Sequence, residues 1–162
     1  MIELISTRLT FLETVDLWAA YSEVLGADEL HASYGARWPR LPFPEEQVYE
    51  FRIPTCGGTG ELVGWASLLY SPFEQITWHS HGIYPEFQRQ KMTKPLTDMS
   101  KGLGFSETPC LALGAKILDT NATYQAWMRE NHVARGWKAA GRVTLPTAYD
   151  LYVILREDWV NK

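Results

Sequence analysis

Hydrophobic and polar residues follow two different spacings along the chain, and each spacing predicts an element. Residues 2–12 are rich in apolar and β-branched side chains, which predicts a first strand. An amphipathic helix is predicted next by an apolar stripe at i, i+4, i+7 and i+8, formed by Leu17, Tyr21, Val24 and Leu25. Gly26 follows directly and is a typical helix stop.

Three strands are predicted in series after an irregular segment. Residues 26–46 contain Pro39, Pro42 and Pro44, which prevent one continuous helix. Residues 48–53, 61–70 and 75–84 then read as strands, and the glycine-rich residues 55–60 read as the hairpin loop between the first two. A series of this kind favours an antiparallel meander.

The second half alternates helices and strands. A short helix is predicted by Leu96, Met99 and Leu103, with Pro95 near its start and stop signals in Gly102 and Gly104. A mostly apolar strand follows at residues 110–118. The next helix has Asp119 or Thr120 as its cap and an inner stripe of Tyr124, Trp127 and Met128. Residues 137–145 and 149–155 read as two final strands.

This order of elements predicts the fold class. Strand–helix–strand units favour parallel neighbours, while the central series favours antiparallel ones. The result is a mixed sheet with helices on its faces, an α/β (α+β) fold. Its 162 residues are one domain in length, and we find no linker or repeat, so residues 1–162 are expected to form a single domain.

Composition narrows the function classes. The chain is 46% hydrophobic and 21% charged, as in ordinary globular proteins, and its net charge of −4 argues against a nucleic-acid partner. Two cysteines, Cys56 and Cys110, are too few for a disulfide scaffold or a structural zinc site. The first residues lack the pattern of a signal peptide, and no run approaches a membrane span. We therefore expect a cytoplasmic protein with no membrane partner.

Two stretches carry a family resemblance. In the first, residues 83–93, Ile83, Pro85 and Gln88 fall on fixed positions of a V-x-P-x-x-[RQ]-x-x-G-x-[GA] segment. In the second, residues 136–141 are similar to a G-F-x-x-x-G strand start. The chain resembles the GNAT family of N-acetyltransferases in these stretches and in its element order. The resemblance implies a mixed, mostly antiparallel seven-stranded sheet flanked by helices, with acetyl-CoA as the cofactor.

The resemblance places the cofactor at the turn between a strand and a helix. Free N–H groups and the positive helix end at such a turn suit a pyrophosphate. Lys91 and Thr93 stand where the family has small residues, so charge from Lys91, Arg89 and Lys94 is the alternative source of phosphate affinity. The cofactor-binding residues implied in this way are Ile83, Tyr84, Gln88, Arg89, Gln90, Lys91, Met92, Thr93 and Asn121. Asn121 also competes for the helix cap.

Acetyl transfer needs a base, a polarised carbonyl and an acid for the leaving thiolate. The resemblance assigns the thioester oxygen to the backbone N–H of Ile83 or Tyr84. His79 and His81 share one strand face and are candidate bases; part of a metal site, or two half-exposed structural histidines, are the alternatives. No third ligand is apparent, so no metal is expected.

The acid is not settled by counting along the chain. Counting back four residues from Gly136 gives His132, whereas counting seven forward from Asn121 gives Met128. Neither position is the tyrosine that the family often has there. Tyr124 lies one turn earlier and is the remaining tyrosine of this helix, either as an acid or as a core residue.

Two functions follow from these patterns. The first is an acetyl-CoA-dependent N-acetyltransferase acting on a primary amine of a small molecule or protein. Residues 26–46 would wall the acceptor site, with aromatic rings and four carboxylates, Asp28, Glu29, Glu45 and Glu46, or would be a packed surface loop.

The alternative function is a catalytically inactive GNAT-like protein with a binding or structural role. Some phage-encoded virion proteins have an Asn-x-x-[His/Tyr]-x-x-aromatic-[Leu/Met] helix, which Asn121, Tyr124, Trp127 and Met128 match. A homodimer or a protein assembly stays open.

Overall fold

One seven-stranded sheet organises the protein, in the order β1-β2-β3-β4-β5-β7-β6. The computed structural model describes residues 3–57 and 60–160; Ile2 and the middle of the predicted hairpin loop, residues 58–59, lie outside these ranges. The strands are β1 (Ile5–Arg8), β2 (Gln47–Arg52), β3 (Leu62–Ser71), β4 (Ile76–Ile83), β5 (Ala112–Leu118), β6 (Lys138–Val143) and β7 (Tyr149–Leu155). The helices are α1 (Phe11–Leu25), α2 (Ala27–Tyr34), α3 (Pro85–Arg89), α4 (Thr93–Glu107), α5 (Ala122–Asn131) and α6 (Arg156–Val160).

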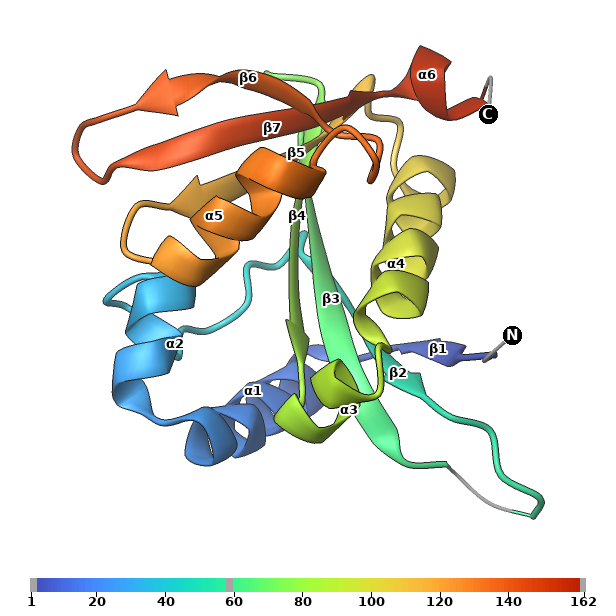
Figure 1. The fold of residues 1–162 in the computed structure, drawn as a ribbon. Coiled ribbons are helices and arrows are strands. Elements are labelled where there is room, and N and C mark those ends of the chain that lie inside the picture. The colour runs from blue at the N-terminus through green and yellow to red at the C-terminus, as the bar shows by residue number, and fades with distance from the viewer. Residues whose placement is uncertain (1–2, 58–59, 161–162) are drawn as a thin grey trace.

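The pairing of the strands confirms the predicted mixed, mostly antiparallel sheet. Every neighbouring pair is antiparallel except β4 and β5, which are parallel. That parallel pairing covers only Ile76–Ala112, Thr77–Leu113 and Trp78–Gly114. Because β4 continues to Ile83 and β5 to Leu118, the two strands diverge beyond this point, as Figure 1 shows. The sheet is therefore open at its centre.

Helices cover both faces of the sheet (Figure 1). On one face α1 and α2 enclose an aromatic cluster in which Trp38 stacks on Trp65, with ring centres 5.5 Å apart and planes 8° apart. Trp18 lies 5.6 Å from Trp65, and all three indoles are at most 5% exposed. On the other face α4 buries Leu96 against β2 and β3. Gly82 on β4 is required here, because a Cβ would lie 2.4 Å from the Trp65 ring nitrogen.

A buried carboxylate fixes the segment between α2 and β2. Glu46 accepts two hydrogen bonds from Arg40, each 2.8 Å long, and one from the Ser67 hydroxyl. Burial raises the pKa of Glu46, but these hydrogen bonds outweigh it and the net pKa is lowered. Glu46 is thus a structural anion and does not face an amine acceptor.

Three predicted boundaries were wrong, each for a local reason. The first strand ends at Arg8, because Thr10 and Glu13 form a capping box that starts α1 at Phe11. Residues 27–34 form α2, which was predicted as irregular. Only Leu30 of this helix is buried, so its mostly polar sequence has no apolar stripe to indicate a helix. Helix α4 continues through both predicted stop glycines to Glu107. Gly104 is needed there for packing, since a Cβ would lie 2.5 Å from the Leu113 side chain.

No helix within residues 3–57 and 60–160 is long and apolar enough to cross a membrane. Both cysteines are free, Cys56 at the surface and Cys110 in the core.

Candidate functional site

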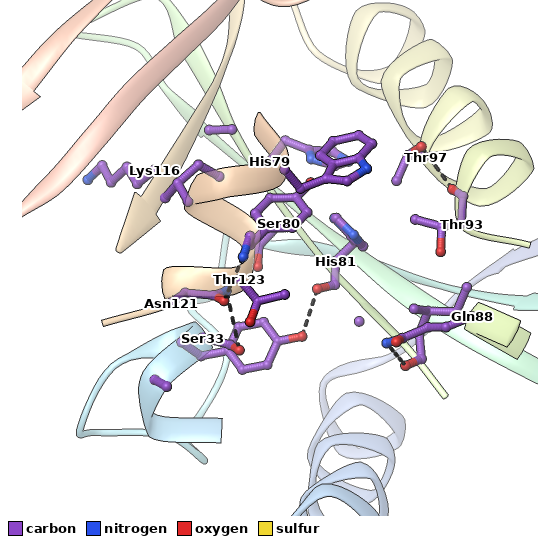
Figure 2. Close-up of a pocket in the computed structure, with 18 of the residues that line it drawn as sticks. Ser33, His79, Ser80, His81, Gln88, Thr93, Thr97, Lys116, Asn121 and Thr123 are labelled. Atoms are coloured by element: carbon purple, nitrogen blue, oxygen red, sulfur yellow. Dashed lines mark hydrogen bonds between the residues drawn. The ribbon is translucent and has the colours of Figure 1, made fainter. Parts of the chain in front are cut away.

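A cavity of about 760 Å³ lies where β4 and β5 diverge. Its walls come from α1, α2, α4 and α5 and from the facing edges of the two strands. Figure 2 shows His79, Ser80 and His81 at its centre, with Thr93 and Thr97 on one side and Asn121 and Ser33 on the other. Segments far apart in the sequence therefore meet around one partly open, partly polar cavity.

The backbone of β4 presents polar groups to this cavity. The Tyr84 amide donates to the Val63 carbonyl at 3.0 Å, which marks a hydrogen-bonded pair between β4 and β3. Because such pairs alternate along an antiparallel ladder, the even-numbered residues of β4 bond to β3. The odd-numbered residues turn their N–H and C=O groups toward β5. Beyond Trp78, β5 has diverged, so the backbone groups of His81 and Ile83 face the cavity.

Side chains already occupy two of these backbone groups. The Tyr34 hydroxyl donates to the His81 carbonyl at 2.8 Å, and Gln88 Nε2 donates to the Ile83 carbonyl at 3.2 Å. Tyr21 lies 3.3 Å from the Tyr34 hydroxyl. Burial raises the pKa of Tyr21 to about 12, against a smaller opposing effect of its hydrogen bond with Tyr34. The Tyr84 amide is thus engaged within the sheet and is not available to a thioester oxygen. The Ile83 amide, like that of His81, faces the cavity.

The two histidines lie inside the cavity wall with ring centres 5.7 Å apart. His79 is 8% exposed, and its Nε2 lies 2.6 Å from Ser100 Oγ on α4. Burial lowers the pKa of His81 to about 4, with further lowering by Lys101 and Arg135; burial likewise holds the pKa of His79 well below its usual value. Both imidazoles are therefore neutral at pH 7. In the described part of the chain, no three His, Cys, Asp or Glu side chains gather to hold a metal.

Of the two acid candidates, Tyr124 and His132, the structure brings only Tyr124 into the cavity wall. Its ring centre lies 6.1 Å from His81 and 5.6 Å from Trp127, and burial raises its pKa to about 12, opposed by Arg135. Met128 is 1% exposed and packs in the core. His132 bonds the Met128 carbonyl through Nδ1 at 2.8 Å, packs on Tyr152 and is not among the residues that line the cavity.

The turn before α4 keeps its shape without the glycine of the resemblance. Lys91 has φ +59°, the left-handed conformation that glycine adopts without strain. The turn nevertheless has few amides to offer a phosphate. The Lys91 amide donates to Gln88, the Met92 amide to Phe87 and the Leu96 amide to Met92, and Pro95 has no N–H. The amides of Thr93 and Lys94 are left at the start of the helix.

The side chains of the predicted cofactor loop divide in three. Gln88 and Thr93 line the cavity. Arg89, Gln90 and Lys91 are exposed at the surface. Met92 is fully buried against β3 and α3, so its side chain belongs to the core and has no cofactor role.

Asn121 caps α5 and ties it to α2. Its Oδ1 accepts from the Tyr124 amide at 3.3 Å, and its Nδ2 donates to Ser33 at 3.4 Å. The neighbouring Thr120 hydroxyl donates to the Ala32 carbonyl at 2.8 Å. Asp119 pairs with Arg142, so neither of the predicted alternatives is the cap. The cap role of Asn121 occupies the oxygen that the resemblance would offer to a cofactor.

Sequence analysis missed two cations of the cavity wall, Lys101 and Arg135. A signal for the first was present: the inner stripe of α4 at Thr97, Ser100, Lys101 and Gly104 has helical core spacing but mostly polar residues. All four are buried. Nothing in the sequence near Arg135 distinguishes it from a surface arginine.

The sheet order, the divergence of β4 and β5 and the cavity between them define a GNAT-like acetyltransferase fold. The sequence matches no known family model and no curated protein. The fold is similar to that of spermidine N-acetyltransferase SpeG of Vibrio cholerae, solved with CoA and spermine, with a TM-score of 0.71 and 12% identity over 98% of both chains. A chimera of that enzyme with hSSAT gives a TM-score of 0.69 and 14% identity, over 98% of this chain and 99% of the other. Its dodecameric form gives a TM-score of 0.68 and 12% identity, over 98% and 96%. At these identities the likeness shows the fold alone.

Proposed function

We propose that this protein is an acetyl-CoA-dependent N-acetyltransferase acting on a primary amine of a small molecule or protein. The observation that carries the proposal is the cavity between β4 and β5, into which β4 directs the His81 amide. An N–H fixed in a strand and directed into a cavity is suited to stabilise an oxygen that gains negative charge. The fold's likeness to an acetyltransferase solved with CoA supports this reading.

The residues present fit the two ends of acetyl-CoA unequally. At the thioester end, the open edge of β4, Tyr124 and Thr97 surround a space of adequate size. At the phosphate end, the two amides of Thr93 and Lys94 are supplemented by the exposed side chains of Arg89 and Lys91. When bound, acetyl-CoA supplies an activated acetyl carbon. Affinity for the phosphates then rests on charge more than on backbone hydrogen bonds.

The chain's own groups support the transfer in a defined order. The nitrogen of a neutral amine forms a bond to the acetyl carbon, and the carbon–sulfur bond breaks with its electron pair staying on sulfur. The His81 amide binds the carbonyl oxygen while it carries negative charge. The amine loses one proton, for which we propose His81 as the acceptor that passes it to water; His81 is neutral at pH 7 but only weakly basic, because burial lowers its pKa to about 4. The thiolate takes up a proton, so the products are an amide and a thiol.

Calorimetry and product analysis test the proposal directly. Acetyl-CoA is titrated into the protein, and amine panels are then assayed by mass spectrometry for gain of one acetyl group. Lys91→Glu places an anion beside the phosphates and is expected to weaken acetyl-CoA binding about tenfold, or about 1.4 kcal/mol. Lys138→Glu, the same reversal on β6, is the control and should bind as the parent does. If no heat of binding is detected at millimolar acetyl-CoA, the proposal is contradicted.

A second candidate is a GNAT-like protein without catalysis, used for binding or as a structural component. Two observations favour it. Met128 is buried at the position where the count from Asn121 would place the family's tyrosine. Most amides of the turn before α4 already donate hydrogen bonds within the chain. Binding of acetyl-CoA without acetylation of any amine would support this second role. One structural neighbour is dodecameric, and we propose a homo-oligomer here as well, to be measured by light scattering.

A further inference from the structure

Arg135 reaches from the segment between α5 and β6 to the first turns of α4. Its Nη2 donates to Thr97 Oγ1 at 2.6 Å, and Thr97 donates to the Thr93 carbonyl at 2.9 Å. All three residues line the cavity, and Figure 2 shows Thr93 and Thr97 together on one side of it. The guanidinium is thereby held one turn from the start of α4, where the amides of Thr93 and Lys94 are left.

Both ends of Arg135 are fixed by the chain. Its amide donates to the Asn131 carbonyl at 3.1 Å, and its carbonyl accepts from Lys101 Nζ at 2.9 Å. At the other end, besides the bond to Thr97, the guanidinium carbon lies 6.0 Å from the centre of the Trp127 ring. A side chain held in this way loses little conformational entropy when it binds a ligand.

The guanidinium of Arg135 keeps hydrogen-bond donors for a ligand, because it carries several N–H groups on three nitrogens. Among the described residues, Thr97 is the one hydrogen-bond acceptor of this side chain. The Asp98 carboxylate lies 3.7 Å from Nη2, too far for a hydrogen bond, and makes a contact of 2.6 Å with Lys94. The side chain is 14% exposed, and none of its nitrogens is a fully buried atom without a partner. The remaining N–H groups are therefore open to a ligand.

The charge of Arg135 acts inside the cavity. Burial and Lys101 lower the pKa of His81, and Arg135 lowers it further. At Tyr124 burial raises the pKa to about 12, and Arg135 opposes this rise. Because the Arg135 side chain is largely shielded from solvent, its charge is screened less than those of exposed arginine and lysine side chains in the cofactor loop.

We propose that Arg135 binds the pyrophosphate of acetyl-CoA and takes the place of backbone amides that the turn before α4 does not offer. This inference rests on the proposed function. The amides of Lys91, Met92 and Leu96 are engaged within the chain. A pyrophosphate is an anion with several acceptor oxygens, and the planar fork of a guanidinium matches the spacing of phosphate oxygens. The contact comes from a segment beyond α5, where no signal in the cofactor loop would reveal it.

Calorimetry and phosphorus NMR of the full chain test this role. Arg135→Gln removes the charge and is expected to weaken the binding of acetyl-CoA about tenfold to a hundredfold. Acetyl-dephospho-CoA, which keeps the pyrophosphate and lacks the ribose phosphate, should lose the same factor. In the complex with CoA, Arg135→Gln should move the pyrophosphate signals toward those of free CoA and leave the ribose-phosphate signal as in the parent.

Two further variants separate ligand binding from support of the fold. Arg135→Lys keeps the charge but not the fork, so the expected loss is about threefold, with the pyrophosphate signals moved part of the way toward free CoA. Arg142→Gln is the matched control, because this arginine of β6 pairs with Asp119 and Asp150 and does not line the cavity. It should bind CoA as the parent does. If Arg135→Gln does not fold, the signals of CoA bound to Arg135→Lys decide the question.

Each result has one meaning. CoA that binds the parent and gives the same pyrophosphate signals with the Arg135 variants overturns the role of Arg135 and leaves the acetyltransferase proposal standing. A change in the ribose-phosphate signal alone, or an equal loss of affinity in Arg142→Gln, overturns that role in the same way. CoA that does not bind the parent overturns both proposals.

Discussion

The two regions that border β4 are built on opposite principles. Toward α1 and α2, the strand closes an aromatic cluster in which Trp18, Trp38 and Trp65 are packed without a gap. Toward β5, the same strand borders a cavity whose α4 side buries Thr97, Ser100 and Lys101. The cluster buries apolar area and stabilises the fold. The cavity buries charge and hollow space, which both cost free energy. Stability and candidate chemistry are thus separated across one strand.

The difference extends to how each region treats its polar atoms. In the cluster, the indole N–H groups of Trp18 and Trp65 have no hydrogen-bond partner among the described residues, and packing outweighs that loss. In the cavity, Tyr34 donates to the His81 carbonyl and Gln88 donates to the Ile83 carbonyl, both on β4. A region that satisfies some groups and leaves others open is organised to receive a ligand.

Trp65→Ala removes a central ring of the aromatic cluster and has the largest expected effect on the free energy of unfolding. The side chain is fully buried against two other indoles, so its removal should lower the free energy of unfolding by about 3–5 kcal/mol. Urea denaturation measures the change. Trp127→Ala is the matched control on the cavity side, where the ring is 39% exposed and the loss should be much smaller. Equal losses would mean that the cluster does not dominate stability.

The second prediction concerns how the stability contributed by His81, in the cavity wall, depends on pH. The folded pKa of His81 is about 4, below its unfolded value of about 6.5, so its contribution to stability is complete above pH 6.5. That contribution is lost as the pH falls from about 6.5 to about 4, at about 1.4 kcal/mol for each pH unit. His81→Gln should remove this part of the slope in unfolding experiments between pH 7 and pH 4. An unchanged slope would show that His81 titrates normally in the folded protein.

The smallest predicted effect lies at the boundary between the two regions. Tyr34 stacks within the cluster, 4.6 Å from Trp38, and its hydroxyl bonds the His81 carbonyl in the cavity. Tyr34→Phe keeps the ring and removes the hydroxyl, which should cost about 1 kcal/mol in denaturant unfolding. A loss comparable to that of Trp65→Ala would contradict the separation of the two regions.

The framework of the sheet could be predicted because its signals are local. Residues 48–53 and 61–70 read as strands from their composition and flanking turns, and the structure confirms both to within one residue. Helix α2 was missed because a short helix with one buried residue leaves no periodic stripe. Lys91 in a left-handed conformation was equally hidden, since the sequence alone suggested that only a small residue fits there.

The candidate site could be predicted only in part. His79, His81, Gln88, Thr93 and Tyr124 were expected near a ligand and do line one cavity. The contact between Lys101 and Arg135 joins residues 34 positions apart, and Tyr34, which bonds the His81 carbonyl on β4, lies 47 positions before it. Such proximity depends on how whole elements pack, which no local pattern contains.

The contacts of α2 with the start of α5 have a mechanical consequence. β4 and β5 diverge after their last paired residues, and α2 lies across the gap between them. Tyr34 of α2 donates a hydrogen bond to the His81 carbonyl on β4. Ala32 and Ser33 of α2 accept hydrogen bonds from Thr120 and Asn121, which follow β5. Because α2 is hydrogen-bonded to both strands' open ends, it limits how far these ends can move apart. The eight residues of α2 therefore help to set the width of the cavity. Changes in α2 can widen or narrow the space without any change to the sheet.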